Sequence, residues 1–147
     1  MARKSSGCVV YRINEELATM EILLVKSRQG KNWVFPKGGV EPDLTSRESA
    51  AKEVYEEAGV RGVVGQKLGM YRYVKNDQMQ KVTMYAMRYT GEAADWPEEG
   101  LRERKWFAVE KAMNKVSEFL APFIRDVMKM SLENEMKGLE DPTSFDE

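Results

Sequence analysis

The chain has 147 residues, enough for one compact domain with its own core and too few for two. Its 23 lysines and arginines are balanced by 24 aspartates and glutamates, so no net field draws the whole chain to nucleic acid or to a membrane surface. The absence of histidine excludes serine–histidine nucleophiles, histidine-ligated zinc and a histidine general base. Any chemistry must therefore rest on carboxylates, lysine, tyrosine or a metal held by oxygen.

The remaining bulk features favour a cytoplasmic protein that works without a membrane. The single cysteine, Cys8, cannot form an internal disulfide, and we expect it to be an inert buried thiol in an apolar strand. No apolar run is long enough to span a bilayer. The N-terminal residues also lack the apolar centre of a signal peptide.

In chain order, two strands come first. Residues 8–12 and 21–26 are apolar and β-branched, which predicts short strands joined by the polar stretch 13–20. A basic loop covers residues 27–32. After a short apolar piece, the Pro-Lys-Gly-Gly run at 36–39 predicts an interruption of regular structure.

A helix is predicted next. Thr45, with Glu48 three residues later, fits a capping box, and the helical pattern extends to Ala58. Gly59 is placed to close this helix in the left-handed conformation. The segments 60–74 and 81–89 predict two further strands, and a last short strand is expected at 105–109.

The C-terminal third predicts amphipathic helix, because apolar residues recur at helical spacing from Ala112 to Val127. Pro122 is unfavourable inside a helix, so we expect a break near Ser117 and a second helix that has Pro122 near its start. The acidic tail, residues 138–147, is expected to be disordered. The prediction is a single α/β domain over residues 1–137.

Three glutamates give the clearest indication of chemistry. Glu53, Glu56 and Glu57 stand at positions i, i+3 and i+4, so they share one face of the predicted helix. Like charges there repel each other and crowd the negative end of the helix dipole. A divalent cation such as Mg²⁺ or Mn²⁺ would offset that repulsion and could bridge phosphates and an attacking water.

A phosphate-binding loop is expected just upstream of these glutamates. Gly38 and Gly39 allow backbone N–H groups to approach a phosphate closely, and Lys37 adds an ammonium beside them. A Gly-Gly turn alone is a weak signal. The capped acidic helix at this spacing makes it much stronger.

These residues together resemble the Nudix box, G-x5-E-x7-R-E-U-x-E-E-x-G-U. With Gly38 as the first glycine, the three glutamates, Gly59 and the two aliphatic positions fall in register. Leu44 stands where the box has its first glutamate, and Lys52 where it has arginine. Because lysine lacks the bidentate fork of arginine, we expect the geometry between loop and helix to be supported differently here.

Flanking residues resemble the branch that hydrolyses diphosphoinositol polyphosphates and diadenosine polyphosphates. The resemblance covers most of residues 3–130. It rests on the order of the segments Cys8–Arg12, Leu23–Val25, Trp33–Pro36, the box, Gly65-x-x-x-Gly69, Asp95–Trp96 and Arg104–Phe107. It implies the Nudix fold, a mixed β-sheet sandwiched between α-helices. It also implies water attack at phosphorus in a phosphoanhydride, with Glu53, Glu56 and Glu57 as metal ligands and catalytic residues.

Further substrate contacts are expected from cations outside the loop. The resemblance favours Arg28 and Lys81, and Arg3 is a third choice. Lys4, Lys31, Arg102 and Arg104 are further candidates, although each single cation is more often an ordinary surface charge. Glu98, Glu99 and Glu103, in the segment before Trp106, could supply an extra base, but a solvated loop is the simpler interpretation.

The residues leave the substrate open. A dinucleotide requires aromatic or apolar surface for a base, whereas a diphosphoinositol polyphosphate requires many cations, and the net charge of −1 mildly favours the nucleotide. A triphosphorylated RNA end and a nucleoside diphosphate sugar also stay open. The main rival is a Nudix-fold module that binds a nucleotide without cleaving it, and a partner-binding domain rests on composition alone.

Overall fold

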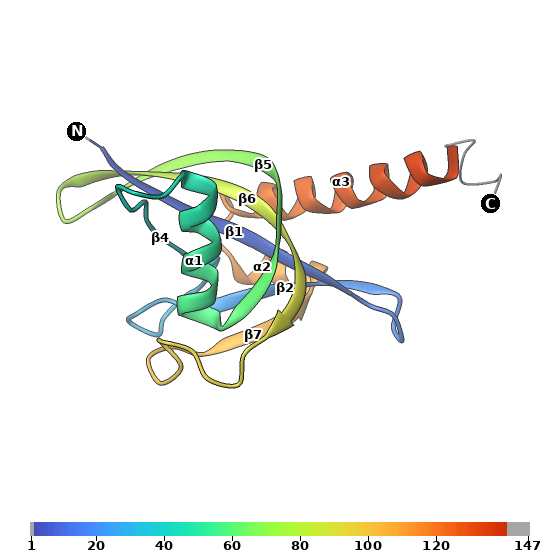
Figure 1. Cartoon of the computed structure of the whole chain (residues 1–147), viewed down its shortest axis with the longest axis horizontal. Coiled ribbons are helices and arrows are strands. Elements are labelled where there is room, and N and C mark those ends of the chain that lie inside the picture. Colours follow the sequence, from blue (N-terminus) through green and yellow to red (C-terminus); the bar gives the residue numbers. More distant parts are fainter. Residues whose placement is uncertain (1, 141–147) are drawn as a thin grey trace.

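A mixed β-sheet lies between helices on both of its faces (Figure 1). The computed structural model describes residues 2–140. The elements within that range are β1 (Arg3–Asn14), β2 (Thr19–Lys26), β3 (Trp33–Val34), β4 (Lys37–Gly39), α1 (Ser46–Ala58), β5 (Val60–Lys75), β6 (Gln78–Glu92), β7 (Arg104–Ala108), α2 (Val109–Lys115) and α3 (Ala121–Glu140). The predicted fold class is confirmed.

Strand β1 is the centre of the sheet. It runs parallel to β6 along one edge, and along its other edge it pairs with β4 near its start and with β2 near its end, both antiparallel. Gly7 lies where β4 joins, and a Cβ atom there would come within 2.6 Å of the Cβ of Lys37. A side chain at this position would therefore push β4 away, so glycine lets β4 and β2 diverge from one central strand.

The two faces of the sheet bury separate hydrophobic clusters. Alternate residues of β1 show the division: Cys8 and Val10 pack with Ala50 and Val54 of α1. Val9 faces the other way and packs with residues of α2 and α3 that include Ile124. Because strand side chains alternate between the two faces of a sheet and both faces of β1 are buried, its sequence is a continuous apolar run.

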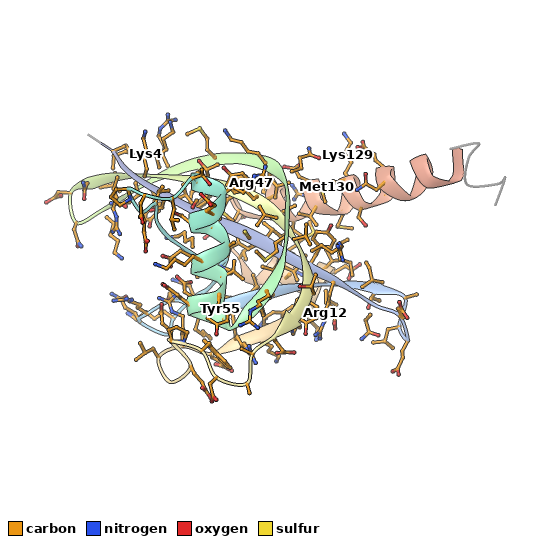
Figure 2. The ribbon with its side chains drawn as sticks, in the orientation of Figure 1. Lys4, Arg12, Arg47, Tyr55, Lys129 and Met130 are labelled. Atoms are coloured by element: carbon orange, nitrogen blue, oxygen red, sulfur yellow. The ribbon has the colours of Figure 1, made fainter. Side chains whose placement is uncertain are left out.

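Local signals set the bounds of α1 as predicted. The side chain of Thr45 accepts a hydrogen bond from the backbone N–H of Glu48, whose own carboxylate accepts from the backbone N–H of Thr45. Gly59 closes the helix with φ of 66°. Figure 2 shows Arg47 near the start of α1, where its guanidinium donates to the carbonyl oxygens of Val64 and Gly65 in β5. The helix is thereby capped at both ends and fastened to the sheet.

The interruption predicted at 36–39 is wrong in part, because residues 37–39 form β4. Their partners in β1 are Ser5, Ser6 and Gly7, which precede the expected start of that strand at Cys8. Short polar and glycine segments carry no strand pattern of their own, so this pairing depends on long-range register.

The C-terminal third breaks where the sequence predicts. Helix α2 ends before Ser117, and Pro122 is the second residue of α3, where its missing N–H is tolerated. Helix α3 continues to Glu140, three residues into the predicted tail, and residues 141–147 lie outside the described part. Its far half projects beyond the sheet (Figure 1). None of the helices described is long and apolar enough to cross a membrane.

The capping box predicts a defined loss of stability. Thr45→Ala removes the side-chain acceptor at the start of α1 and should lower the free energy of unfolding by about 1 kcal/mol in urea titrations. Thr45→Ser keeps the hydroxyl and should stay close to the unsubstituted protein. Equal losses for both variants would show that the methyl group of Thr45, rather than its hydroxyl, carries the effect.

Candidate active site

A cleft of about 520 Å³ gathers most of the residues that the sequence singled out. Of the predicted site residues it is lined by Arg3, Arg28, Lys37, Gly38, Gly39, Glu53, Glu56 and Glu57. The other lining residues are Ser5, Ser27, Val34, Phe35, Tyr73, Lys75, Gln80, Glu98 and Arg102. Carboxylates from α1 therefore face the glycines of β4, and cations from several elements surround them.

The two glycines of β4 are required by the side chains packed on them. A Cβ atom at Gly38 would collide with the carboxylate of Glu53, and one at Gly39 would lie 2.7 Å from Nη2 of Arg3. Since neighbouring strand residues face opposite ways, β4 has a carboxylate over one glycine and a guanidinium over the next. Any larger residue would displace one of these charged groups.

Glu57 is the most buried of the three glutamates, with 4% of its surface exposed. Its Oε1 accepts hydrogen bonds from the backbone N–H of Lys37 at 3.3 Å and from Nη1 of Arg102 at 3.3 Å. The ammonium of Lys37 in turn donates to the hydroxyl of Tyr73 at 2.8 Å. Glu57 therefore ties α1 directly to β4.

Burial and crowding of charge perturb two of these carboxyl groups. Desolvation raises the pKa of Glu57 to about 8, helped by the negative charges of Glu98 and Glu53 and opposed by Arg102. The pKa of Glu53 is also raised, first by burial and then by the neighbouring charges of Glu56 and Glu98. Buried carboxylates that repel one another are the environment in which a cation is stabilising.

Lys52, which stands where the Nudix box has arginine, supports the loop before α1 through ion pairs. The ammonium of Lys52 bonds to the carboxylate of Glu41 and lies 3.4 Å from Oε1 of Glu56. The backbone N–H of Glu41 also donates to the Ser49 hydroxyl at 3.1 Å. The loop before α1 is thus held to the helix by side chains, which is the different support expected from the sequence.

The residues fit a divalent cation that is held partly by water or substrate. Among the described residues, no three carboxylates or thiolates already converge as a metal-ligand set. Instead Glu53 rests on Gly38, Glu56 is turned to Lys52, and Glu57 is bonded to Arg102. Mg²⁺ is commonly held by only one or two carboxylates, with phosphates and waters completing its shell, so an oxygen-rich wall of this kind suits it.

Of the candidate cations, Arg3, Arg28 and Arg102 line the cleft, whereas Lys81 does not, and neither do Lys4, Lys31 and Arg104. The neighbour of Lys81, Gln80, lines the cleft and is buried, with 4% of its surface exposed. Because side chains alternate along β6, Lys81 faces the opposite side of the sheet, where its strand partners are Lys4 and Arg72. The sequence indicated the right stretch of strand but not which of its faces meets the site.

Arg102 and Glu98 have a larger part in the cleft than the sequence indicated. Arg102 bridges Glu57 and Oε1 of Glu98, the latter at 3.1 Å, and its side chain is only 10% exposed. Both residues come from the segment 93–103, which has no periodic pattern. The sequence indicated this stretch only through the resemblance around Asp95 and Trp96 and through residue type, with Arg102 as one of several candidate cations and Glu98 as a possible base.

A second cavity of about 290 Å³ adjoins the cleft and shares Val34, Lys37, Tyr73 and Lys75 with it. Its other lining residues are Asn32, Trp33, Tyr71, Lys115, Ser117, Phe119 and Leu120. The rings of Tyr71 and Phe119 meet edge to face with centroids 5.6 Å apart, and Phe119 remains 55% exposed. The cavity therefore combines aromatic surface with ammonium groups.

The fold and the cleft define a class of small α/β domain in which an acidic helix face is packed on a glycine-rich strand and ringed by cations. The chain belongs to the Nudix family, since the NUDIX domain model matches residues 1–127. Members of this family generally use divalent metal ions. The predicted family, and with it the Nudix hydrolase class of enzyme, is confirmed.

Relatives and solved structures agree with this membership. The chain is 34% identical to Nudix hydrolase 16, mitochondrial, of Arabidopsis thaliana over 86% of this chain and 78% of that protein. It is 38% identical to diphosphoinositol polyphosphate phosphohydrolase 2 of Rattus norvegicus over 76% of this chain, and it spans 61% of that relative's length. A crystal structure of C. elegans Ap4A hydrolase superposes with a TM-score of 0.73 at 21% identity, covering 88% of this chain and 98% of that one.

The raised pKa of Glu57 predicts a pH dependence of stability. In the folded chain the carboxyl keeps its proton up to about pH 8, whereas in the unfolded chain it ionises near its ordinary value of 4.5. The unfolded state therefore binds fewer protons between these values, and the contribution of Glu57 to stability falls as pH rises through that window. Urea unfolding with a chelator should show this fall in the unsubstituted protein and a smaller one in Glu57→Gln. Parallel pH profiles for the two proteins would contradict the assignment.

Proposed function

We propose that this protein hydrolyses a phosphoanhydride bond of a small phosphorylated substrate with the help of Mg²⁺ or Mn²⁺. The observation that carries the proposal is the pair of carboxylates set against β4, the buried Glu57 and the half-buried Glu53, with cations around them. In the reaction, the oxygen of water forms a bond to phosphorus, the bridging P–O bond breaks, and the water proton passes to a base.

The three glutamates of α1, which form the acidic wall of the cleft, have two roles. Glu53, Glu56 and Glu57 hold the metal, and Glu56 or Glu57 orients or deprotonates the water. Bound there, a divalent ion offsets charge on the phosphates and makes the attacking water more acidic. Of the three side chains, that of Glu57 is the most firmly held, because its carboxylate accepts hydrogen bonds from both Lys37 and Arg102.

The basic residues of the cleft would position the phosphates. Arg3 lies over Gly39, and the Lys37 ammonium is anchored by Tyr73. Arg28 and Lys75 add two further positive charges to the lining of the cleft. Cations placed around a reacting phosphoryl group stabilise the charge that develops on its oxygens.

The second cavity favours a nucleotide as the rest of the substrate. Tyr71, Phe119 and Trp33 offer ring surface on which a base can stack, and Lys115 and Lys75 can meet phosphates between base and cleft. A dinucleoside polyphosphate has this arrangement, with a polyanionic middle and an aromatic end. Diadenosine polyphosphates are therefore the leading substrates.

Diphosphoinositol polyphosphates are the second candidate. The likeness to the rat phosphohydrolase supports them, as do Lys37 and Lys75, which line both cavities. Against them, Arg102 is already paired with two carboxylates, and the three glutamates and Glu98 lower the net positive charge of the cleft. An RNA 5′-triphosphate end and a nucleoside diphosphate sugar are less favoured alternatives.

A substrate panel tests the proposal. With Mg²⁺ or Mn²⁺, the protein should release product from diadenosine tetraphosphate faster than from diphosphoinositol pentakisphosphate, ADP-ribose or triphosphorylated RNA. Glu57→Gln should lower turnover by orders of magnitude and leave the fold intact, because it removes a charge from the acidic wall and keeps the volume. Glu133→Gln, on the exposed part of α3, is the matched control and should cleave normally.

Two results would overturn the proposal. Normal turnover by Glu57→Gln would show that the reaction does not use this wall. The second is that the unsubstituted protein cleaves no compound of the panel but binds one of them tightly in calorimetry. That result would indicate a Nudix-fold module that binds a nucleotide without cleaving it.

The choice between the two leading substrates has its own test. Phe119→Ala removes a ring from the second cavity and should raise KM for diadenosine tetraphosphate roughly tenfold, since stacking on a base contributes about 1–3 kcal/mol. Leu132→Ala, on the exposed face of α3, should leave KM unchanged. An equal rise in KM for the inositol substrate would show that Phe119 shapes the protein and does not recognise a base.

A further inference from the structure

Arg102 is the one basic side chain of the described cleft that the structure bonds to two acidic groups from different elements. Its Nη1 lies 3.3 Å from Oε1 of Glu57 on α1, and its Nε lies 3.1 Å from Oε1 of Glu98 in the segment 93–103. All three side chains are largely buried, with 10% exposure for Arg102, 6% for Glu57 and 17% for Glu98. The guanidinium therefore joins a helix carboxylate to a loop carboxylate.

The backbone of this segment is anchored without the help of the Arg102 side chain. The backbone N–H of Ala93 donates to the carbonyl oxygen of Gly59 at 2.8 Å, and that of Glu98 donates to the carbonyl oxygen of Glu56 at 3.0 Å. Arg104 donates to the carbonyl oxygen of Ala58 at the end of α1. The segment thus stays on the last turn of α1 when only the side chain of Arg102 is changed.

The two carboxylates need a cation between them. When both groups are ionised, their negative charges repel strongly because they are largely shielded from water. A guanidinium that bonds to both offsets that repulsion and fixes their direction. Glu56 has a different partner, the ammonium of Lys52, whose side chain is 42% exposed. A pair so accessible to water is weak and lets Glu56 turn, whereas Glu57 is held.

We propose that Arg102 is a positioning residue that holds the carboxyl groups of Glu57 and Glu98 together in one fixed orientation facing the reacting phosphate. The inference rests on the proposed function of the cleft and adds to it that Arg102 acts through Glu57 and does not need to touch substrate. Glu98 then belongs to the same working group of carboxylates as the three glutamates of α1. Lysine could replace the charge of Arg102 but not its simultaneous donation to two carboxylates.

Steady-state kinetics with saturating Mg²⁺ tests this inference on the unsubstituted protein, Arg102→Lys and Arg102→Met. Because a displaced carboxylate lowers the rate of the chemical step, Arg102→Met should lower kcat on the order of 10²-fold and change KM less than threefold. The kcat of Arg102→Lys should lie between those of the unsubstituted protein and Arg102→Met. Arg125→Met, the same substitution on exposed α3, is the control and should match the unsubstituted protein. Thermal unfolding measures the folded fraction, so that kcat is expressed per folded molecule.

A second readout needs neither metal nor turnover. In a buffer with a chelator, the Nε–H proton of Arg102 should exchange slowly with water in nitrogen-edited NMR spectra, and Glu98→Gln should shift its signal and speed its exchange. Exchange as fast as that of Arg125 would overturn the pairing and the inference with it.

The kinetic outcomes separate the alternatives. A rise in KM with kcat unchanged in Arg102→Met would make Arg102 a direct phosphate contact and overturn the positioning role. Normal kcat per folded molecule would show a structural role only. If the unsubstituted protein cleaves nothing, the proposed function fails first and takes this inference with it. An undiminished kcat in Arg102→Met overturns this inference alone.

Discussion

The site depends on one tight contact, the packing of carboxylates from α1 directly on the glycines of β4. Glu53 occupies the space where a side chain at Gly38 would be, and Glu57 accepts a hydrogen bond from the backbone of Lys37. Both carboxyl groups lose water in this packing, and their pKa values rise as a result. In the proposed function, a divalent cation would relieve that electrostatic penalty, and a phosphate bound to the cation would bring its own negative charge toward the basic residues opposite.

The rest of the fold holds this contact in place from both ends of α1. At its start, the capping box at Thr45 and the bonds from Arg47 to β5 fix the first turn. At its end, Arg104 bonds to the carbonyl oxygen of Ala58 while its guanidinium lies 3.8 Å from the ring of Trp96, which itself packs on Gly59. The segment that closes the cleft is therefore built on the same helix turn that carries the glutamates.

Sequence reasoning succeeded where the determining interactions are local. The caps of α1 and the shared face of its glutamates follow from spacings of three and four residues. It failed where long-range pairing decides: β4 exists because residues 5–7 pair with it, and Lys81 misses the cleft because β6 places Gln80 on that face. The bridge made by Arg102 depends on how residues 93–103 fold back on α1, and no local pattern predicts that.

We propose that the acidic face of α1 is a metal site next to the glycines of β4. Anomalous diffraction from crystals grown with Mn²⁺ tests it most directly, because the signal locates the ion independently of activity. We expect the strongest peak in the cleft, bonded to the carboxylate of Glu57 and to that of Glu53 or Glu56. A strongest peak elsewhere on the protein, or an empty cleft at Mn²⁺ concentrations that support cleavage, would contradict the account.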